Sequence, residues 1–217
     1  MELFTLEGQL FLLRWIHFLS GITWIGILYY FNFIQTPFLA TELGGQARSQ
    51  MMRGLVPNAL WWFRWGAMMT FITGVVLLGV LGATLSGYIL LGALMGTFMM
   101  LNVWLIIWPK QKVVLGLAQG DVAASAAKAG LASRTNTLFS APMLFCMLAS
   151  KHGAAVPEGM AIITSGMSNG LLAAIGLAVL IELNAIFGKM GPMASVKGVI
   201  HLSLLLTVVM VALIVYV

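Results

Sequence analysis

Residues 198–217, GVIHLSLLLTVVMVALIVYV, show which class of protein this chain belongs to. A helix needs about 20 residues to cross the hydrocarbon core of a bilayer, and this stretch contains no Asp, Glu, Lys or Arg and one histidine, His201. Over the whole chain of 217 residues, 61% are hydrophobic and 8% are charged. This number of charged residues is too small to cover a water-facing surface. The sequence therefore predicts an integral membrane protein and excludes the soluble enzyme classes.

Six apolar runs are candidates for transmembrane helices: 9–38, 61–83, 87–108, 137–150, 168–187 and 198–217. The fourth is short and contains Pro142. The two long connections, 39–60 and 109–136, are predicted to hold short amphipathic or interfacial helices, and the second has an Ala-rich stretch at 121–132. The expected fold is an all-α, polytopic membrane helical bundle of about six transmembrane helices, forming a single integral membrane domain over residues 1–217.

Basic residues gather in alternate loops, which is a signal of membrane topology. The loops after the first, third and fifth runs carry Arg48, Arg53, Lys110, Lys112, Lys128, Arg134, Lys189 and Lys197. These loops are predicted to be cytoplasmic, with both termini on the outer, periplasmic side of a bacterial-type inner membrane. The net charge of +5 is spread over these loops, so no nucleic-acid partner is expected.

The single cysteine, Cys146, limits the redox chemistry available to this chain. It excludes an intrachain disulfide framework, a multi-cysteine zinc site and the two-cysteine attachment of a c-type haem. Walker, H-E-x-x-H and nucleotide-binding motifs are also missing. Any catalysis is therefore expected to depend on a bound cofactor or on the few polar residues inside the apolar runs.

The first apolar run places Arg14, His17, Gly21 and Trp24 at spacings of three, four and three residues, which is one helix face. Imidazole is a common axial ligand of haem, and glycine lets a flat group approach the backbone. His17 is therefore a candidate ligand of haem b, with Arg14, Gly21 and Trp24 beside it. The alternative is a histidine hydrogen-bonded between helices beside a packing glycine.

Two further histidines are candidate second ligands of the haem iron. His152 closes the fourth run, where it is either a ligand or a solvated interfacial residue. His201 is expected at a similar depth to Glu182 on the neighbouring antiparallel helix. That pair could orient a metal-bound histidine, relay protons, or form a static buried hydrogen bond.

Copper is a further alternative, because the chain has 15 methionines and because Met95, Met99 and Asn102 share a helix face. Methionine is also an adaptable filler of apolar interiors. No cluster of Cys and His supports a copper site.

Four segments resemble the N-terminal membrane domain of the membrane-integral urate hydroxylases. They are residues 14–17 with 21–26, residues 102–104 with 107–112 (including Trp-Pro-Lys-Gln-Lys), residues 133–137 with 141–145, and residues 150–152. The last third is similar more loosely, through residues 182–185. The pattern in the first run is also similar to haem-associated membrane protoporphyrinogen oxidases and to copper-resistance membrane proteins.

The resemblance implies an oxidoreductase that oxidises urate, or a similar reduced substrate, and passes electrons to a cytochrome c. In that version Arg134 and Asn136, or Lys110 and Gln111, are candidate contacts for the anionic purine, and Glu182 is a candidate catalytic carboxylate. The family commonly carries a fused C-terminal cytochrome, whereas this chain ends at Val217. A separate cytochrome c or another subunit of a membrane complex is therefore the expected partner. The alternative is a non-catalytic membrane subunit of a larger respiratory or oxidase complex.

Overall fold

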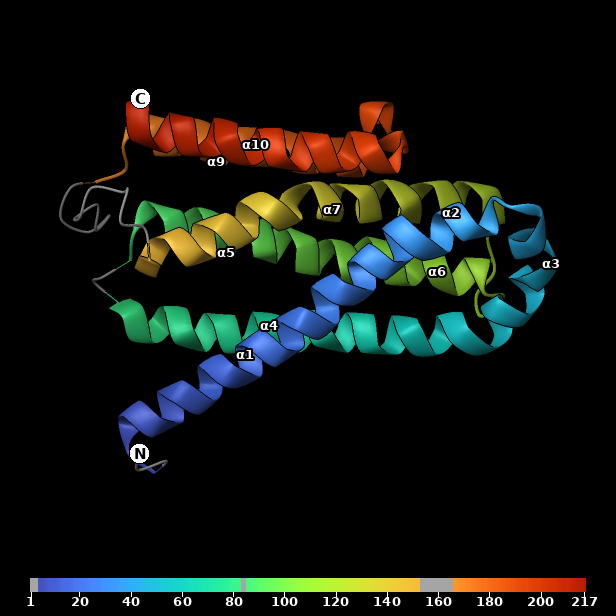
Figure 1. Ribbon diagram of the computed structural model, residues 1–217, viewed down its shortest axis with the longest axis horizontal. Helices are drawn as coiled ribbons and strands as arrows, with labels where there is room; N and C mark the ends of the chain where they lie inside the picture. The colour runs from blue at the N-terminus through green and yellow to red at the C-terminus, as the bar shows by residue number, and fades with distance from the viewer. Residues whose placement is uncertain (1–3, 83–84, 153–165) are drawn as a thin grey trace. The chain divides into compact units, whose positions relative to one another are not determined.

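The computed structural model describes residues 4–82, 85–152 and 166–217. The elements in these ranges are helices, which confirms the all-α fold class (Figure 1). The long helices are α1 (Leu6–Tyr29), α4 (Val56–Leu81), α5 (Gly87–Leu101), α7 (Val122–His152), α9 (Asn169–Phe187) and α10 (Val196–Tyr216). The short ones are α2 (Thr36–Leu39), α3 (Glu42–Gln50), α6 (Trp108–Val114) and the 3₁₀-helix η5 (Gly191–Ala194).

Small polar side chains begin several of these helices. The hydroxyls of Thr5, Thr41, Ser168 and Ser195 each accept a hydrogen bond from the backbone N–H three residues on, at 2.9–3.2 Å. A first-turn N–H has no partner within its own helix, so such a cap stabilises the helix start by about 1 kcal/mol. Local sequence therefore determines where α1, α3, α9 and α10 begin.

Within the described residues, five stretches of helix are long and apolar enough to cross a membrane: Leu6–Leu39, Glu42–Val80, Gly87–Val114, Asn169–Phe187 and Val196–Tyr216. They correspond to five of the six predicted runs. The fourth run, 137–150, is the second half of α7, a continuous helix of 31 residues that includes Pro142. The Ala-rich stretch predicted as a separate interfacial helix is the first half of α7, because its good helix formers continue into the apolar run without a break.

Three π-helical segments interrupt the α-helices in the part of the chain that the structure describes. They are η1 (Tyr30–Gln35), η2 (Met51–Leu55) and η4 (Asn102–Ile107). A π segment changes the register of side chains around the helix axis and is frequent at functional sites. Here η1 and η4 bury amide side chains in an otherwise apolar helix, namely Asn32, Gln35 and Asn102.

The described chain forms two compact units. Unit 1 comprises Met1–Leu77 and Met100–Ser133, and unit 2 comprises Leu78–Met99 and Arg134–Val217. In unit 1, Phe31 packs edge-on against the buried Phe63, with ring centroids 5.6 Å apart. In unit 2, α9 packs on α10, and the backbone of Gly170 approaches the carbonyl of Leu213 so closely that a side chain would overlap it.

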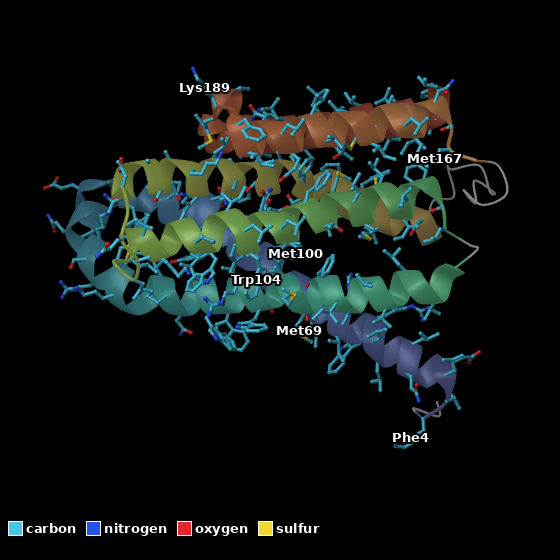
Figure 2. All side chains as sticks on the ribbon, turned by 180° about the vertical axis from the view of Figure 1, so that it is seen from behind. Phe4, Met69, Met100, Trp104, Met167 and Lys189 are labelled. Atoms are coloured by element: carbon cyan, nitrogen blue, oxygen red, sulfur yellow. The ribbon has the colours of Figure 1, made fainter. Side chains whose placement is uncertain are left out.

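The surface of the helices is apolar while several polar side chains are inside. Leu180 and Val208 are each 65% exposed, and apolar side chains project outward along the helices (Figure 2). By contrast, Thr135 and Asn136 are completely buried. This distribution fits a protein whose helices contact lipid, since lipid tails solvate apolar side chains and leave polar groups to be satisfied inside.

Candidate functional site

His17 lies in α1, where the structure holds its imidazole against α4. Nδ1 of His17 is 2.9 Å from Oγ1 of Thr73. The Thr73 hydroxyl also contacts the Met69 carbonyl at 2.7 Å, as the donor. A hydroxyl has one proton to donate, so Thr73 accepts the hydrogen bond from His17 and Nδ1 carries the ring proton. Nε2 of the neutral imidazole then keeps its lone pair, which is the form that binds a metal.

The predicted face of α1 packs against α4. His17 contacts Thr73, Gly21 faces Thr70, and the backbone of Trp24 faces Gly66. This order shows that the two helices run antiparallel. Arg14, the fourth member of the predicted face, is exposed. His17 is half-buried and lies on this face between the exposed Arg14 and the buried Trp24.

Two glycines on this interface have different roles. A Cβ on Gly74 would lie 3.2 Å from Cε1 of His17, so glycine leaves room for the imidazole against α4. A Cβ on Gly21 would lie 3.9 Å from Cγ2 of Thr70, which is ordinary van der Waals contact. The space beside Gly21 that the sequence predicted for a flat group is therefore occupied by α4.

Unit 1 also contains buried polar atoms without a hydrogen-bond partner among the described residues. They are Nε1 of Trp24, Oε1 of Gln35 and Nε of Arg64. Buried polar groups in native structures are mostly hydrogen-bonded, so each such atom needs an explanation. The neighbouring Asn32 is satisfied, because its Nδ2 donates to Oγ of Ser133 at 2.8 Å.

The predicted substrate contacts Lys110 and Gln111 lie on α6. Lys110 is exposed and Gln111 is half-buried. The neighbouring cation, Lys112, instead approaches the ring of Trp108, as does Arg64 from α4.

The predicted contacts Arg134 and Asn136 lie in the most buried part of α7. Arg134 is 6% exposed, and its Nη1 has no hydrogen-bond partner in the described part of the chain. Burial lowers the pKa of the Arg134 guanidinium from its usual range, yet arginine remains cationic. Asn136 donates from Nδ2 to the carbonyl of Met99 at 2.9 Å. Arg134 is thus a buried cation, whereas Asn136 is built into helix packing.

The remaining predicted residues lie in unit 2. Glu182 is buried on α9 and His201 is exposed on α10, so their side chains occupy different environments. α7 ends at His152, but the side chain of His152 lies outside the described part of the structure.

Among the described residues, no three His, Cys, Asp or Glu side chains lie close enough together to share a metal ion. Met95 and Met99, considered as copper ligands, are completely buried within unit 2. That position matches the packing role of methionine.

Sequence reasoning missed Thr73 and Arg64. Thr73 lies 56 residues from His17 and becomes its partner only through the packing of α4 on α1. Arg64 carried an available signal, because an arginine within an apolar run is a functional-site hypothesis by default.

Comparison with known proteins matches residues 81–212 to the family model described as urate oxidase N-terminal. The match covers more than half of the chain and includes Arg134, Asn136, Glu182 and His201, whereas His17 and Thr73 precede it. Curated proteins and solved structures give no match to the chain.

Proposed function

Because the chain belongs to the urate oxidase N-terminal family, we propose that it is a membrane oxidoreductase domain that oxidises urate or a closely related purine anion. The family match supports the reaction class, and the five long apolar helices support the location in a membrane. The residues that bind cofactor and substrate are proposed from the geometry of each unit.

The hydrogen bond between His17 and Thr73 is the observation on which the cofactor assignment rests. Metal-bound histidines usually donate their other ring N–H to a protein acceptor, which fixes the tautomer and orients the ring. His17 has this arrangement before any ligand is considered. We therefore assign Nε2 of His17 as the atom that would hold the iron of a b-type haem, which would supply one-electron redox chemistry.

Nε2 of His17 is suited to bind the iron of a haem, and the packing of α4 on α1 limits which neighbouring residues could contact the haem. Since α4 occupies the space over Gly21, that glycine would not contact a haem held by His17. His17 is the only histidine in the sequence of unit 1. Ligation by His152 or His201, which belong to unit 2, stays a prediction.

Arg134 supports the proposed binding of an anionic purine. A buried guanidinium whose Nη1 lacks a hydrogen-bond partner can donate to the oxygen or deprotonated nitrogen of such an anion. Replacing Arg134 by Gln removes the charge, so we expect roughly a tenfold or larger rise in the urate concentration for half-maximal rate. Arg134→Lys keeps the charge without the planar fork and should be affected less.

We further propose that electrons leave to an outer cytochrome c or to another subunit of a membrane complex. The basic loops support both termini on the periplasmic side, a topology in which α7 would be a sixth crossing through its apolar half at 137–150. At about 1.5 Å per residue, the 31 residues of α7 extend about 46 Å, longer than a hydrocarbon core of about 30 Å.

The test is urate-dependent reduction of added cytochrome c by the purified, haem-loaded chain in lipid nanodiscs. We expect reduction with urate, none with the neutral purine adenine, and loss of reduction in His17→Ala. Failure of urate and of related purine anions to reduce either haem or cytochrome c would contradict the substrate class.

A further inference from the structure

Arg64 is a cation inside an apolar helix, and the structure holds it against an aromatic ring. Its Cζ lies 3.9 Å from the ring centroid of Trp108. Arg64 belongs to α4 and Trp108 begins α6, so the contact joins two helices of unit 1. A guanidinium over an indole face is favourable, and more so where water is excluded.

A second cation approaches the same ring. Nζ of Lys112 lies 5.8 Å from the Trp108 centroid. Because both cationic groups contact one ring, they lie within about 10 Å of each other. Neither makes an ion pair with a described residue. Two cations at this separation in a medium of low dielectric repel each other unless an anion lies nearby.

The Arg64 side chain has a donor left to offer. Its Nε is buried and has no hydrogen-bond partner among the described residues. The backbone beneath it is fixed, because Nε1 of Trp104 donates to the Arg64 carbonyl at 3.2 Å. Trp65 in turn packs edge-on against Trp104, with centroids 5.4 Å apart. The guanidinium is therefore held in place while one of its hydrogen bonds is unmade.

The surroundings indicate which anion is available. Three tryptophans on the same turns of α4 are partly exposed: Trp61 by 45%, Trp62 by 54% and Trp65 by 41%. Tryptophan is enriched at the membrane–water interface, at the depth of the lipid headgroups. Arg64 lies between these residues in the sequence, so its depth is that of lipid phosphates. Figure 2 shows Trp104 among the side chains of this region.

We propose that Arg64 and Lys112, held on the ring of Trp108, bind the phosphate of an anionic phospholipid such as phosphatidylglycerol. Arginine presents a planar fork that matches phosphate oxygens, and lysine adds a second positive charge. Basic pockets between transmembrane helices bind anionic headgroups in the same way. This site is independent of the urate assignment, since it uses neither His17 nor Arg134.

The test is native mass spectrometry of the full chain in detergent, titrated with phosphatidylglycerol and, separately, with phosphatidylcholine. The variants are Arg64→Gln, Lys112→Gln and the double substitution. Lys110→Gln is the matched control, because Lys110 is an exposed cation on the same helix.

We expect the wild-type chain and Lys110→Gln to bind phosphatidylglycerol more tightly than phosphatidylcholine. Each substitution at Arg64 or Lys112 should weaken phosphatidylglycerol binding about tenfold, as expected for loss of a charge-assisted hydrogen bond. Equal binding of both lipids, or unchanged preference in the double variant, overturns the proposal. Complete competition by millimolar inorganic phosphate would assign the site to free anions instead of lipid.

If the Arg64 variants fail to fold, the proposal is still tested by substitutions at Lys112 and Trp108. Lys112 is half-buried at the end of α6, and Lys112→Gln alone must then lower the preference for phosphatidylglycerol. Trp108→Phe keeps an aromatic face for both cations and should retain most of the binding, whereas Trp108→Leu should lose it.

Discussion

Replacement of Thr73 by Val tests the assignment of His17 as a haem ligand through a residue that the haem does not touch. Val has nearly the shape of Thr but no hydroxyl, so Nδ1 of His17 loses its Thr73 acceptor and the backbone of Thr70 is left as the polar group beside the imidazole. Thr73 is 4% exposed, and its hydroxyl proton is shared with the Met69 and Thr70 carbonyls of its own helix. The change therefore removes the 2.9 Å hydrogen bond between the Thr73 hydroxyl and His17. The other hydrogen bonds of this hydroxyl lie within α4.

The expected magnitude follows from that single bond. A neutral hydrogen bond contributes about 1 kcal/mol net, and loss of a partner behind a ligating histidine lowers metal affinity about 10- to 100-fold. We expect haem affinity of Thr73→Val to fall about tenfold, near the lower end of this range, because the neutral hydroxyl is a weaker acceptor than a carboxylate. The free energy of unfolding should change by about 1 kcal/mol or less, since the new side chain is apolar in an apolar helix.

The assay is a titration of the detergent-purified apoprotein with haem, followed by the Soret absorbance. Thr73→Ser is the control, because it keeps the hydroxyl and should bind haem like the wild type. Wild-type affinity in Thr73→Val, combined with loss of binding in His17→Ala, would refute the role given to Thr73. Wild-type affinity in both variants would refute the ligand itself.

Three further predictions concern the glycines and the buried amide. Gly74→Ala places a methyl group 3.2 Å from Cε1 of His17 and should shift or weaken the haem spectrum, whereas Gly79→Ala on the same helix, with open space around it, should not. Gly170→Ala should lower the thermal midpoint in detergent because its Cβ meets the Leu213 carbonyl, while Gly176→Ala should be neutral or stabilise by up to about 1 kcal/mol. Asn136→Ala leaves the buried Met99 carbonyl without its partner and should destabilise the fold by about 1–3 kcal/mol, measured by chemical denaturation.

Hydropathy and helix periodicity were sufficient to predict the fold class and five of the six apolar runs. The ends of the helices were less predictable, since α4 begins at Val56, ahead of the predicted 61, through a π segment that no propensity scale indicates. α7 was predicted in two pieces, the Ala-rich stretch at 121–132 and the apolar run at 137–150 that contains Pro142. The structure accommodates both within one helix.

The candidate site was predictable only as far as a single helix allows. The periodicity of α1 correctly placed His17, Gly21 and Trp24 on one face, because 3.6 residues per turn fixes that relation locally. The identity of the facing residues depends on the packing of α4, which determines that Thr70 occupies the space beside Gly21. Spacing within one helix could not distinguish open space for a cofactor from packing against a neighbouring helix.

The pairing of Glu182 with His201 shows the same limit. Equal depth on neighbouring antiparallel helices does not determine which way each side chain points around its axis. Glu182 faces inward and is 8% exposed, whereas His201 is exposed. A shared proton between them stays a prediction, as does ligation by His152.

The most direct test of the proposed redox function is a reduced-minus-oxidised visible spectrum of the purified chain, with pyridine haemochrome analysis of the same sample. We predict a b-type spectrum in the wild type and in His201→Ala, and its loss in His17→Ala with helix content retained by circular dichroism. A folded wild-type chain that stays colourless after expression with haem supplied would contradict the account and favour a non-catalytic membrane subunit.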